Sequence, residues 1–438
     1  MVREEPMMYF LETESIGLKK LTQKECTETY VDWMNDEQVT RTLVSGKTPQ
    51  SLEDVQSFIA SSNHAYRITF AIYRKDQNRH IGNVKLDHID WINRKADYGI
   101  LIGDRASWGK GYATQTTKLV VDYAFSILNL NRVYLGVLET NPSASAIYRK
   151  IGFQEEGKKC QDQLVQGQYV DSLFMSITRQ RWLVYGKKVV AIIQARCSSS
   201  RLPGKVLKEL GRKPMIQQVY DRVRKARSVH QTIIATSVDP SDNPLVQLCE
   251  HHAIPYYRGD LNDVLTRFYE AAKAYRAQIL VRITGDCPLI DPEVIDRVVE
   301  VYQDNAQNVD YASNIDFLTY PDGLDTEVFS IHALEQANQK ATMKSDREHV
   351  TPYLRKHMRK INVALDQANY SHLRWTVDQQ EDFDLIQKIF QDLGKEGRYF
   401  GMDEILKWIK SHPHEAGQNI HIPINEGLKK SLEDERTI

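Results

Sequence analysis

Residues 189–207 read VVAIIQARCSSSRLPGKVL, and this stretch decides which fold is expected for the second half of the chain. Its opening run, VVAII, is apolar and mostly β-branched, which is typical of a strand buried on both faces of a parallel sheet. Arg196, Arg201 and Lys205 follow, together with three serines and Gly204. Cations, hydroxyls and small residues at the carboxyl end of a buried strand are suited to bind a polyphosphate. The alternative is a basic surface turn, and the buried strand in front of the loop argues against it.

Strands and helices alternate after this loop. Buried strands are expected at 231–237 and 278–283, and a short strand at 254–257. Helices are expected at 214–226, at 245–251 and in a segment that carries Asp263, Arg267 and Tyr269. This alternation predicts a doubly wound, mostly parallel sheet. Ligands of such sheets bind beyond the carboxyl ends of the strands, where the cationic loop lies.

The spacing Arg196-x4-Arg201-x-Pro-Gly-Lys205 resembles the nucleotide-binding signature of sugar cytidylyltransferases of the spore-coat-polysaccharide type, which are similar to KDO cytidylyltransferase. Ser198 stands where that family usually has Gly or Ala. The resemblance spans about 188–395. It implies transfer of CMP from CTP to a sugar acid with Mg²⁺, and catalytic roles for Lys205, Arg196 and Arg201. The nucleotide-binding residues it implies are Ala195, Arg196, Ser199, Ser200, Arg201, Lys205, Thr236, Arg258, Asp263 and Arg282.

Two carboxylates are candidate Mg²⁺ ligands. Asp286 follows the strand expected at 278–283, and Asp378 ends a strand expected at 374–378. A single carboxylate after a strand can simply cap a turn. Opposite three cations and a triphosphate, however, it suits Mg²⁺, which is usually held by one or two carboxylates and phosphates. The resemblance implies the same role for both residues.

Two polar motifs, at 320–327 and 346–349, resemble stretches that surround the sugar in this family. The second is expected to open the helix VTPYLRKHM. The carboxylate of a sugar acid needs a cation, which Arg347 or Arg355 can supply. His349 is either a ligand or base, or a hydrogen-bonded helix histidine. The substrate-binding candidates are Asp325, Glu327, Arg347, Glu348, His349 and Arg374.

The first part of the chain contains alternating segments at 68–73, 80–90 and 96–102, which predict antiparallel strands. A Gly-rich turn then leads into an apolar helix, and such a junction is an anion site. This order resembles the GNAT acetyltransferase fold, a mixed, largely antiparallel sheet with helices. The resemblance implies acetyl-CoA, with its pyrophosphate on the turn. The expected coenzyme-binding residues are Trp108, Gly109, Lys110, Gly111, Tyr112, Ala113, Thr114 and Asn141.

Tyr148 matches the position of the family's tyrosine acid, which protonates the leaving thiolate; a packing aromatic is the alternative. Glu139 and Asp97 are both candidates for the amine-side base. The segment around Gly167 predicts a hairpin. It resembles acetyltransferases that act on a nucleotide-linked 4-amino sugar in pseudaminic-acid synthesis, and this resemblance spans about 9–182.

At 438 residues the chain is too long for one ordinary core. We expect an acetyltransferase domain at 1–182, a short linker at 183–188, a cytidylyltransferase domain at 189–412 and a C-terminal tail without visible chemistry at 413–438. Lys+Arg 57 against Asp+Glu 58 gives no support for nucleic-acid binding. Five scattered cysteines form no disulfide framework or metal-ligand pair. Because no stretch has the length of a membrane span or signal peptide, a cytoplasmic protein is expected.

The sequence therefore predicts a bifunctional enzyme of nonulosonic, most simply pseudaminic, acid synthesis. Its partners would be small molecules, and the family resemblance adds a homodimer formed by the cytidylyltransferase domain. One alternative keeps both folds and changes the sugar to legionaminic or a KDO-like acid. Another makes the first domain a protein or amine acetyltransferase beside a non-catalytic nucleotide-sugar-binding domain.

Overall fold

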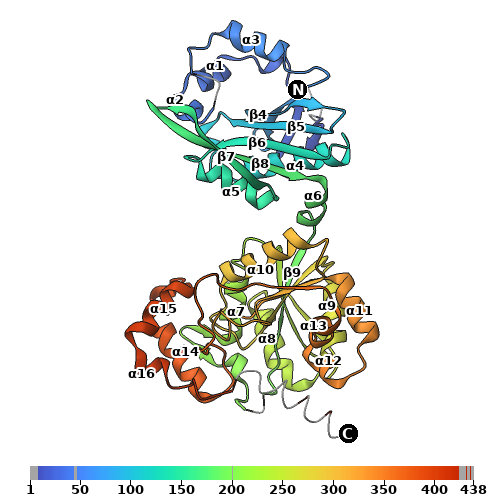
Figure 1. Cartoon of the computed structure of the whole chain (residues 1–438), viewed down its shortest axis with the longest axis vertical. Helices are drawn as coiled ribbons and strands as arrows, with labels where there is room; N and C mark the ends of the chain where they lie inside the picture. The colour runs from blue at the N-terminus through green and yellow to red at the C-terminus, as the bar shows by residue number, and fades with distance from the viewer. Residues whose placement is uncertain (1–7, 44–46, 200, 424–430, 432–434, 436–438) are drawn as a thin grey trace, which may run out of the picture. The chain divides into compact units, whose positions relative to one another are not determined.

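The computed structural model describes residues 8–43, 47–199, 201–423, 431 and 435, and the chain divides into two compact units, Met1–Gly186 and Lys187–Ile438 (Figure 1). All five cysteines are free thiols. Among the described residues, no helix is long and apolar enough to cross a membrane.

The first unit is built on an eight-stranded sheet in the order β1-β2-β3-β4-β5-β6-β8-β7. All neighbours are antiparallel except β5 and β6, which confirms the predicted mixed, largely antiparallel sheet. The strands are β1 (Leu11–Glu12), β2 (Ile16–Lys20), β3 (Ile68–Arg74), β4 (Arg79–Asp90), β5 (Lys95–Ile102), β6 (Arg132–Leu138), β7 (Gln154–Val165) and β8 (Gln168–Thr178). The helices are α1 (Glu28–Asn35), α2 (Glu37–Thr40), α3 (Leu52–Ala60), α4 (Tyr112–Ser126), α5 (Pro142–Ile151) and α6 (Arg179–Tyr185).

Helix α4 supplies much of the core of the first unit. Val120, Val121, Ala124 and Phe125 are fully buried and belong to one hydrophobic cluster with residues of β3 to β6 and β8. Burial of this face, rather than helix propensity alone, stabilises α4. Its N-terminus is thereby held beside β5, where the Gly-rich turn lies.

The second unit is built on a seven-stranded sheet in the order β13-β12-β9-β14-β16-β15-β17, covered by helices (Figure 1). β9 lies between β12 and β14, parallel to both, and all of Val189–Ile193 is buried, as the opening motif predicts. The strands are β9 (Val189–Gln194), β12 (Gln231–Ser237), β13 (Tyr256–Gly259), β14 (Ile279–Thr284), β15 (Tyr311–Ser313), β16 (Glu327–Ser330) and β17 (Lys360–Asn362), with β10 (Glu209–Leu210) and β11 (Lys213–Pro214) as a separate pair. The helices are α7 (Met215–Val223), α8 (Asn243–His251), α9 (Val264–Ala274), α10 (Pro292–Asn305), α11 (Ile331–Lys340), α12 (Lys344–His349), α13 (Pro352–His357), α14 (Gln380–Leu393), α15 (Met402–Ser411) and α16 (Pro413–Ala416).

Three local expectations are corrected. Residues 374–378 form no strand, because only Arg374 makes a single bridge, to Asp322. The helix expected from the 346–349 motif onward is two helices: Val350 ends α12 at φ 72°, and Pro352, which lacks an N–H, starts α13. Residues 183–185 of the expected linker complete helix α6.

Candidate functional site

The predicted loop and the two predicted carboxylates meet beyond the carboxyl ends of β9 and β14. Two cavities adjoin there. The loop cavity, about 250 Å³, is lined by residues of 194–206 together with α9. The acid cavity, about 210 Å³, is lined by Asp322, Asp325 and Glu327 among others. The residues that line both cavities are Arg201, Arg282, Thr284, Asp286, His349 and Asp378.

Lys205 lies between the two carboxylates. It follows Gly204, whose φ of 68° is the left-handed conformation that glycine adopts readily. The ammonium donates to Asp378 Oδ1 at 2.9 Å, to the Val377 carbonyl oxygen at 2.6 Å and to Asp286 Oδ2 at 3.2 Å. Burial lowers the pKa of Lys205, but the carboxylates of Asp286 and Asp378 outweigh it and raise the pKa. Burial likewise raises the pKa of Asp286, but Lys205 and the Thr284 hydroxyl outweigh it and lower the value to about 2.

Asp286 and Asp378 are two oxygen donors of the kind that Mg²⁺ takes. One oxygen of each contacts the Lys205 ammonium within 3.2 Å, so Mg²⁺ bound between them would require that ammonium to turn away. Mg²⁺ prefers oxygen and commonly takes one or two carboxylates plus phosphate oxygens. No group of three or more His, Cys, Asp or Glu side chains in the described part of the chain is arranged to hold a metal ion. A cation here therefore needs the phosphates of a nucleotide as further ligands.

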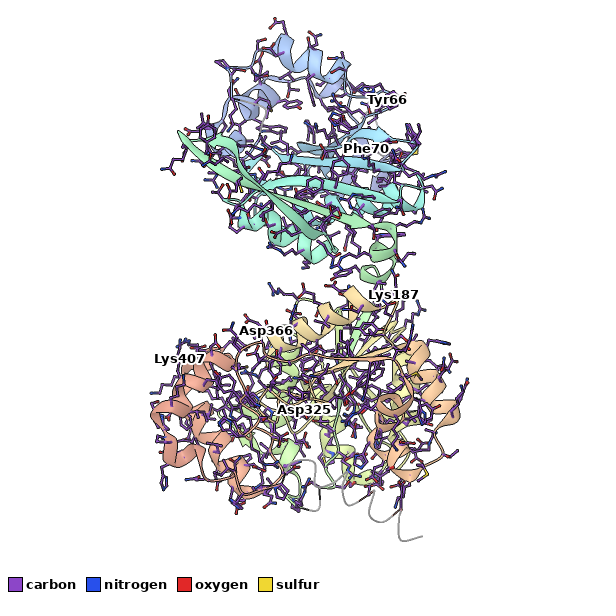
Figure 2. The ribbon with its side chains drawn as sticks, viewed as in Figure 1. Tyr66, Phe70, Lys187, Asp325, Asp366 and Lys407 are labelled. Atoms are coloured by element: carbon purple, nitrogen blue, oxygen red, sulfur yellow. The ribbon has the colours of Figure 1, made fainter. Side chains whose placement is uncertain are left out.

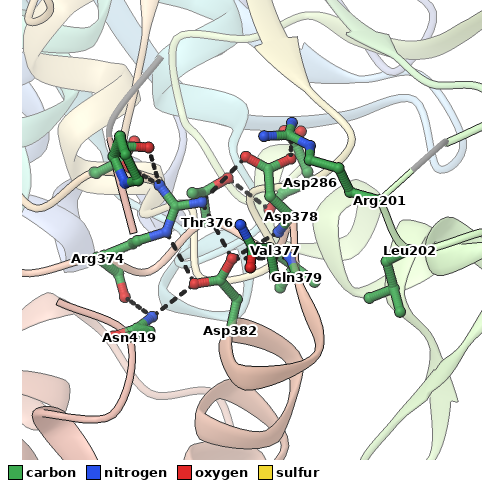
Figure 3. Close-up of polar contacts among 12 residues, drawn as sticks. Arg201, Leu202, Asp286, Arg374, Thr376, Val377, Asp378, Gln379, Asp382 and Asn419 are labelled. Atoms are coloured by element: carbon green, nitrogen blue, oxygen red, sulfur yellow. Dashed lines mark hydrogen bonds and ion pairs between the residues drawn. The ribbon is translucent and has the colours of Figure 1, made fainter. Parts of the chain in front are cut away.

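Arg374 holds the second carboxylate, that of Asp378, in place. Its guanidinium donates to Asp322 at 2.9 Å, to Asp378 Oδ2 at 3.1 Å and to both oxygens of Asp382, at 2.9 and 3.1 Å (Figure 3). Asp382 also accepts the backbone N–H groups of Asp378 and Gln379. Asp378 is thus held through its side chain and its backbone. Asp382 is not among the residues predicted from the sequence, although its place three residues after Gln379 is a helix-start signal.

Two carboxyl groups of the acid cavity have raised pKa values. Burial raises the pKa of Asp325 to about 8, and the neighbouring carboxylates of Asp322 and Glu327 add to the shift. Burial also raises the pKa of Asp322 to about 6, against the opposing effect of Arg374. Asp325, labelled in Figure 2, is partly exposed and lines the acid cavity.

Glu327 has a different environment from Asp325. Its carboxylate accepts hydrogen bonds from Arg282 at 2.6 Å, Tyr311 at 2.8 Å and Thr351 at 2.9 Å. Glu327 therefore holds Arg282 at the junction of the two cavities.

Most of the predicted site residues are brought together. Those that line the loop cavity are Ala195, Arg196, Ser199, Arg201, Lys205, Arg282, Asp286, Glu348, His349 and Asp378. Those that line the acid cavity are Arg201, Arg282, Asp286, Asp325, Glu327, His349, Arg374 and Asp378. Ser200 lies outside the described residues.

Four predicted residues line neither cavity. Thr236 is buried, and Arg258 donates to the carbonyl oxygens of Ser237 and Asp239 after β12. Asp263 caps α9 and pairs with Arg347 at 2.6 Å. Arg347 therefore ties α12 to α9.

Of the two arginines weighed as carboxylate ligands, Arg355 lines the acid cavity. Its Nε donates to Asp316 at 2.9 Å, and Lys360 pairs with the other oxygen of Asp316, also at 2.9 Å. Two cations share this one carboxylate, so the cluster of Arg355, Lys360 and Asp316 carries a net positive charge at the cavity.

Arg267 is a site residue that the sequence analysis did not assign. It lies on α9, is 2% exposed and lines the loop cavity. A Cβ on Gly259 would lie 2.8 Å from Arg267 Cγ, so the glycine makes room for this arginine. Burial lowers the pKa of Arg267 to about 10, although Asp242 opposes the shift; Arg196 lowers it further. An arginine on the otherwise apolar face of α9 was the available signal.

The first unit contains a cavity of about 580 Å³ beside a split in its sheet. Parallel β5 and β6 pair only over Lys95–Asp97 and Arg132–Tyr134, and the strands separate beyond these residues. Asp97 stands at the end of this pairing and lines the cavity, and burial raises its pKa. A split sheet of this kind lets a ligand bind to backbone groups of both strands.

The predicted Gly-rich turn lies at the N-terminus of α4. Gly109 and Gly111 have φ of 72° and 77°, and nothing lies within 4 Å of a Cβ built on either, so conformation rather than crowding requires glycine. Trp108 Nε1 donates to the Ile102 carbonyl oxygen at 2.8 Å, which anchors the turn to the end of β5. Unpaired N–H groups at this helix start can bind an anion.

The other predicted residues of the first unit lie near the split. Tyr148 is buried against Tyr98 and Phe153, and burial raises its pKa to about 12. Asn141 caps α5 by accepting the N–H of Ala144. The two base candidates differ: Asp97 lines the cavity, whereas Glu139 pairs with Lys158 at 2.9 Å.

Comparisons with known proteins agree with this division. Residues 190–410 match the family model described as cytidylyltransferase, and residues 15–154 match that of the acetyltransferase (GNAT) domain. An uncharacterized protein of Methanocaldococcus jannaschii is 36% identical over 241 residues, which cover 54% of this chain and 96% of that protein. The spore coat polysaccharide biosynthesis protein SpsF of Bacillus subtilis is 31% identical over 216 residues, covering 47% of this chain and 88% of that protein.

The first unit matches a different protein. Spermidine N(1)-acetyltransferase of Escherichia coli is 39% identical over 106 residues, which cover 24% of this chain and 56% of that enzyme.

Among solved structures, a cytidylyltransferase from Leptospira borgpetersenii is 27% identical with a TM-score of 0.50, covering 53% of this chain and 98% of that one.

Proposed function

Because this chain belongs to the cytidylyltransferase family and carries a GNAT acetyltransferase domain, we propose that it transfers CMP from CTP to a nonulosonic acid and an acetyl group from acetyl-CoA to an amino sugar. The observation that carries the first activity is the Lys205 ammonium between Asp286 and Asp378, at the junction of two cavities.

In the second unit, the triphosphate of CTP would occupy the loop cavity and the sugar the acid cavity. The anomeric hydroxyl oxygen then forms a bond to the α-phosphorus and loses its proton to a carboxylate of the acid cavity, while the bond between the α-phosphorus and pyrophosphate breaks. Lys205, Arg196 and Arg201 offset the negative charge that grows on the phosphate oxygens. Mg²⁺ held by Asp286 and Asp378 would neutralise further phosphate charge when bound. Arg267 extends the cationic wall of the loop cavity.

An acidic sugar suits the second cavity. Arg355 offers a planar guanidinium for bidentate contact with a carboxylate, and its cluster has a net positive charge. Asp322 and Asp325 line the same cavity and would bind sugar hydroxyls. Pseudaminic acid is the first candidate, because the first domain resembles the amino-sugar acetyltransferases of its synthesis. Legionaminic and KDO-like acids are the alternatives.

In the first unit, acetyl-CoA would lie in the β5–β6 split with its pyrophosphate on the α4 N-terminus. The amine attacks the thioester carbonyl, Asp97 takes the amine proton and Tyr148 protonates the leaving thiolate. A polyamine is a second candidate acceptor, since relatives of this domain are spermidine acetyltransferases and Asp54, Asp97 and Asp162 line the cavity. A protein N-terminus is a third.

The test is pyrophosphate release by the full-length protein with Mg²⁺, each of the four NTPs, and a panel of pseudaminic, legionaminic and sialic acids and KDO. Release only with CTP and one of these acids supports the proposal and names the sugar. No release with any pair, alongside CTP binding, favours a non-catalytic nucleotide-binding unit. CoA release with UDP-linked 4-amino sugars, spermidine and peptides then decides the acetyl acceptor.

A further inference from the structure

The chain beyond residue 410, where the family match ends, contacts the transfer site. Asn419 is fully buried, and its Nδ2 donates to Asp382 Oδ1 at 2.8 Å and to the Arg374 carbonyl oxygen at 3.0 Å (Figure 3). No chemistry is visible in the sequence of residues 413–438, but the structure places the buried amide of Asn419 against Arg374 and Asp382 of the charged cluster.

Asp382 connects Asn419 to Asp378, one of the carboxylates of the transfer site. Its Oδ2 accepts the backbone N–H groups of Asp378 at 2.9 Å and Gln379 at 3.0 Å, and Arg374 bridges from Asp382 to Asp378 Oδ2. The Asn419 amide fixes the rotation of the Asp382 carboxylate and the backbone of Arg374. Both groups hold Asp378, which contacts Lys205 at 2.9 Å.

The same part of the chain contacts the opposite side of the cavities. Glu435 accepts from the backbone N–H of Ser345 at 2.5 Å and from its hydroxyl at 2.7 Å, in the first turn of α12. The Ser431 hydroxyl lies 3.0 Å from His349 Nε2, at the end of that helix. His349 lines both cavities, so these contacts hold a cavity wall.

We propose that three described residues after 410 complete the transfer site: Asn419 positions Asp378, and Ser431 and Glu435 position His349. The inference rests on the proposed cytidylyl transfer. Neither Asn419 nor Ser431 nor Glu435 reaches the reacting atoms in this account, so they are positioning residues.

The test compares full-length Asn419→Ala with Gln418→Ala, an exposed neighbour in the same turn. Hydrogen exchange needs no substrate. Asn419→Ala should increase the exchange rates of the Asp378 and Gln379 amides at least tenfold, because the loss of one hydrogen bond changes a local opening equilibrium by roughly that factor. It should also lower kcat for CMP transfer about tenfold at a temperature well below its melting point, with KM for CTP changed less. A purely structural role would lower the melting temperature and leave kcat unchanged.

Glu435→Gln leaves Asn419 intact and tests the contact with Ser345 of α12, the helix that carries His349. This test remains possible even if Asn419→Ala does not fold. Glu435 is partly exposed, so the fold should survive, while kcat/KM for the sugar acid should fall about threefold. Wild-type exchange rates at 378–379 in Asn419→Ala, or wild-type kinetics in both folded variants, would overturn the inference. Absence of CMP transfer in the wild type counts against the proposed function alone, because the exchange result stands without substrate.

Discussion

Lys205 is shared by two carboxylates in a buried position, and this arrangement serves binding more than stability. Removing one partner of a buried ion pair leaves an uncompensated charge, whereas the intact pair adds little net stability. The ammonium can instead turn to phosphate oxygens when a nucleotide enters the loop cavity, because it donates to three separate acceptors and both carboxylates have further partners. These are Arg201 and Arg374 for Asp378, and the Thr284 hydroxyl for Asp286.

We therefore predict that Lys205→Met lowers kcat/KM for CMP transfer at least ~10²-fold, the scale of one lost charge-stabilising donor. Acetyl transfer by the same protein should be unchanged, since Lys205 belongs to the second unit. Lys208→Met is the matched control: this lysine lies three residues on and contacts Gln380 at 3.2 Å at the surface. Pyrophosphate release and CoA release, measured on one preparation, check both activities. Equal losses in the two lysine variants would contradict the assignment.

Asp325 predicts a pH dependence of stability. Its pKa is raised to about 8 in the folded protein from 3.8, so the folded state holds a proton that the unfolded state loses. Stability from this group is present at low pH and is lost as pH rises from about 4 through about 8. Asp325→Asn should therefore raise the free energy of unfolding at pH 8.5 by ~1 kcal/mol or more, the value of one pKa unit, and by less at pH 5.

Urea unfolding of the metal-free protein, followed in the second unit, measures this difference. Asp316→Asn is the control in the same cavity region, because that carboxylate is paired with two cations. It should lower stability at pH 8.5. A stabilisation by Asp325→Asn that is equal at both pH values would rule out titration of this carboxyl as its cause.

At the residue scale, the sequence located the cationic loop and both carboxylates because residues at the carboxyl ends of parallel strands must share one edge of the sheet. It did not locate Asp382, Arg267 or Asn419, whose roles depend on packing between distant segments. It also placed Arg347 beside the sugar, whereas the structure pairs it with Asp263, 84 residues away. Two oppositely charged residues far apart in sequence give no local signal of their pairing.

The separation of strands β5 and β6 is the main functional feature of the first unit. The strands pair over three residues and then diverge, so backbone groups beyond Asp97 are left for a ligand. We predict that Asp97→Asn lowers kcat for acetyl transfer ~10²-fold, the lower range for loss of a general base, with little change in KM for acetyl-CoA. Glu139→Gln, the other base candidate, should retain activity because Glu139 is paired with Lys158. CoA release against pH measures both. If Glu139→Gln lost more activity than Asp97→Asn, Glu139 rather than Asp97 would be the general base.

At the element scale, strongly patterned segments were predictable. Residues 231–237 form β12 as expected, and the alternating segments at 68–73, 80–90 and 96–102 lie in β3, β4 and β5. The prediction failed where tertiary contacts decide backbone conformation. Residues 374–378 have strand-like composition, but they bridge only to Asp322 and place Asp378 by side-chain contacts. The pattern of side chains does not reveal which backbone lies alongside.

At the scale of the whole molecule, each unit has its own sheet, core and cavities. A domain with its own core can unfold by itself. We therefore predict two calorimetric transitions for the full chain, each responsive to one ligand. Acetyl-CoA at ~100 times its Kd should stabilise the first unit by ~2.7 kcal/mol, a shift of about 5–10 °C for a domain of this size. CTP with Mg²⁺ should shift only the second transition.

Two variants assign the transitions. Lys205→Met should abolish the shift caused by CTP and keep that caused by acetyl-CoA. Gly111→Val should do the reverse, because a β-branched residue at φ 77° strains the turn before α4 by ~1–2 kcal/mol. It should also lower the first transition without ligand, whereas the second should not move. A single transition shifted by both ligands would show instead that the two units unfold together, and binding at one site would then stabilise the other.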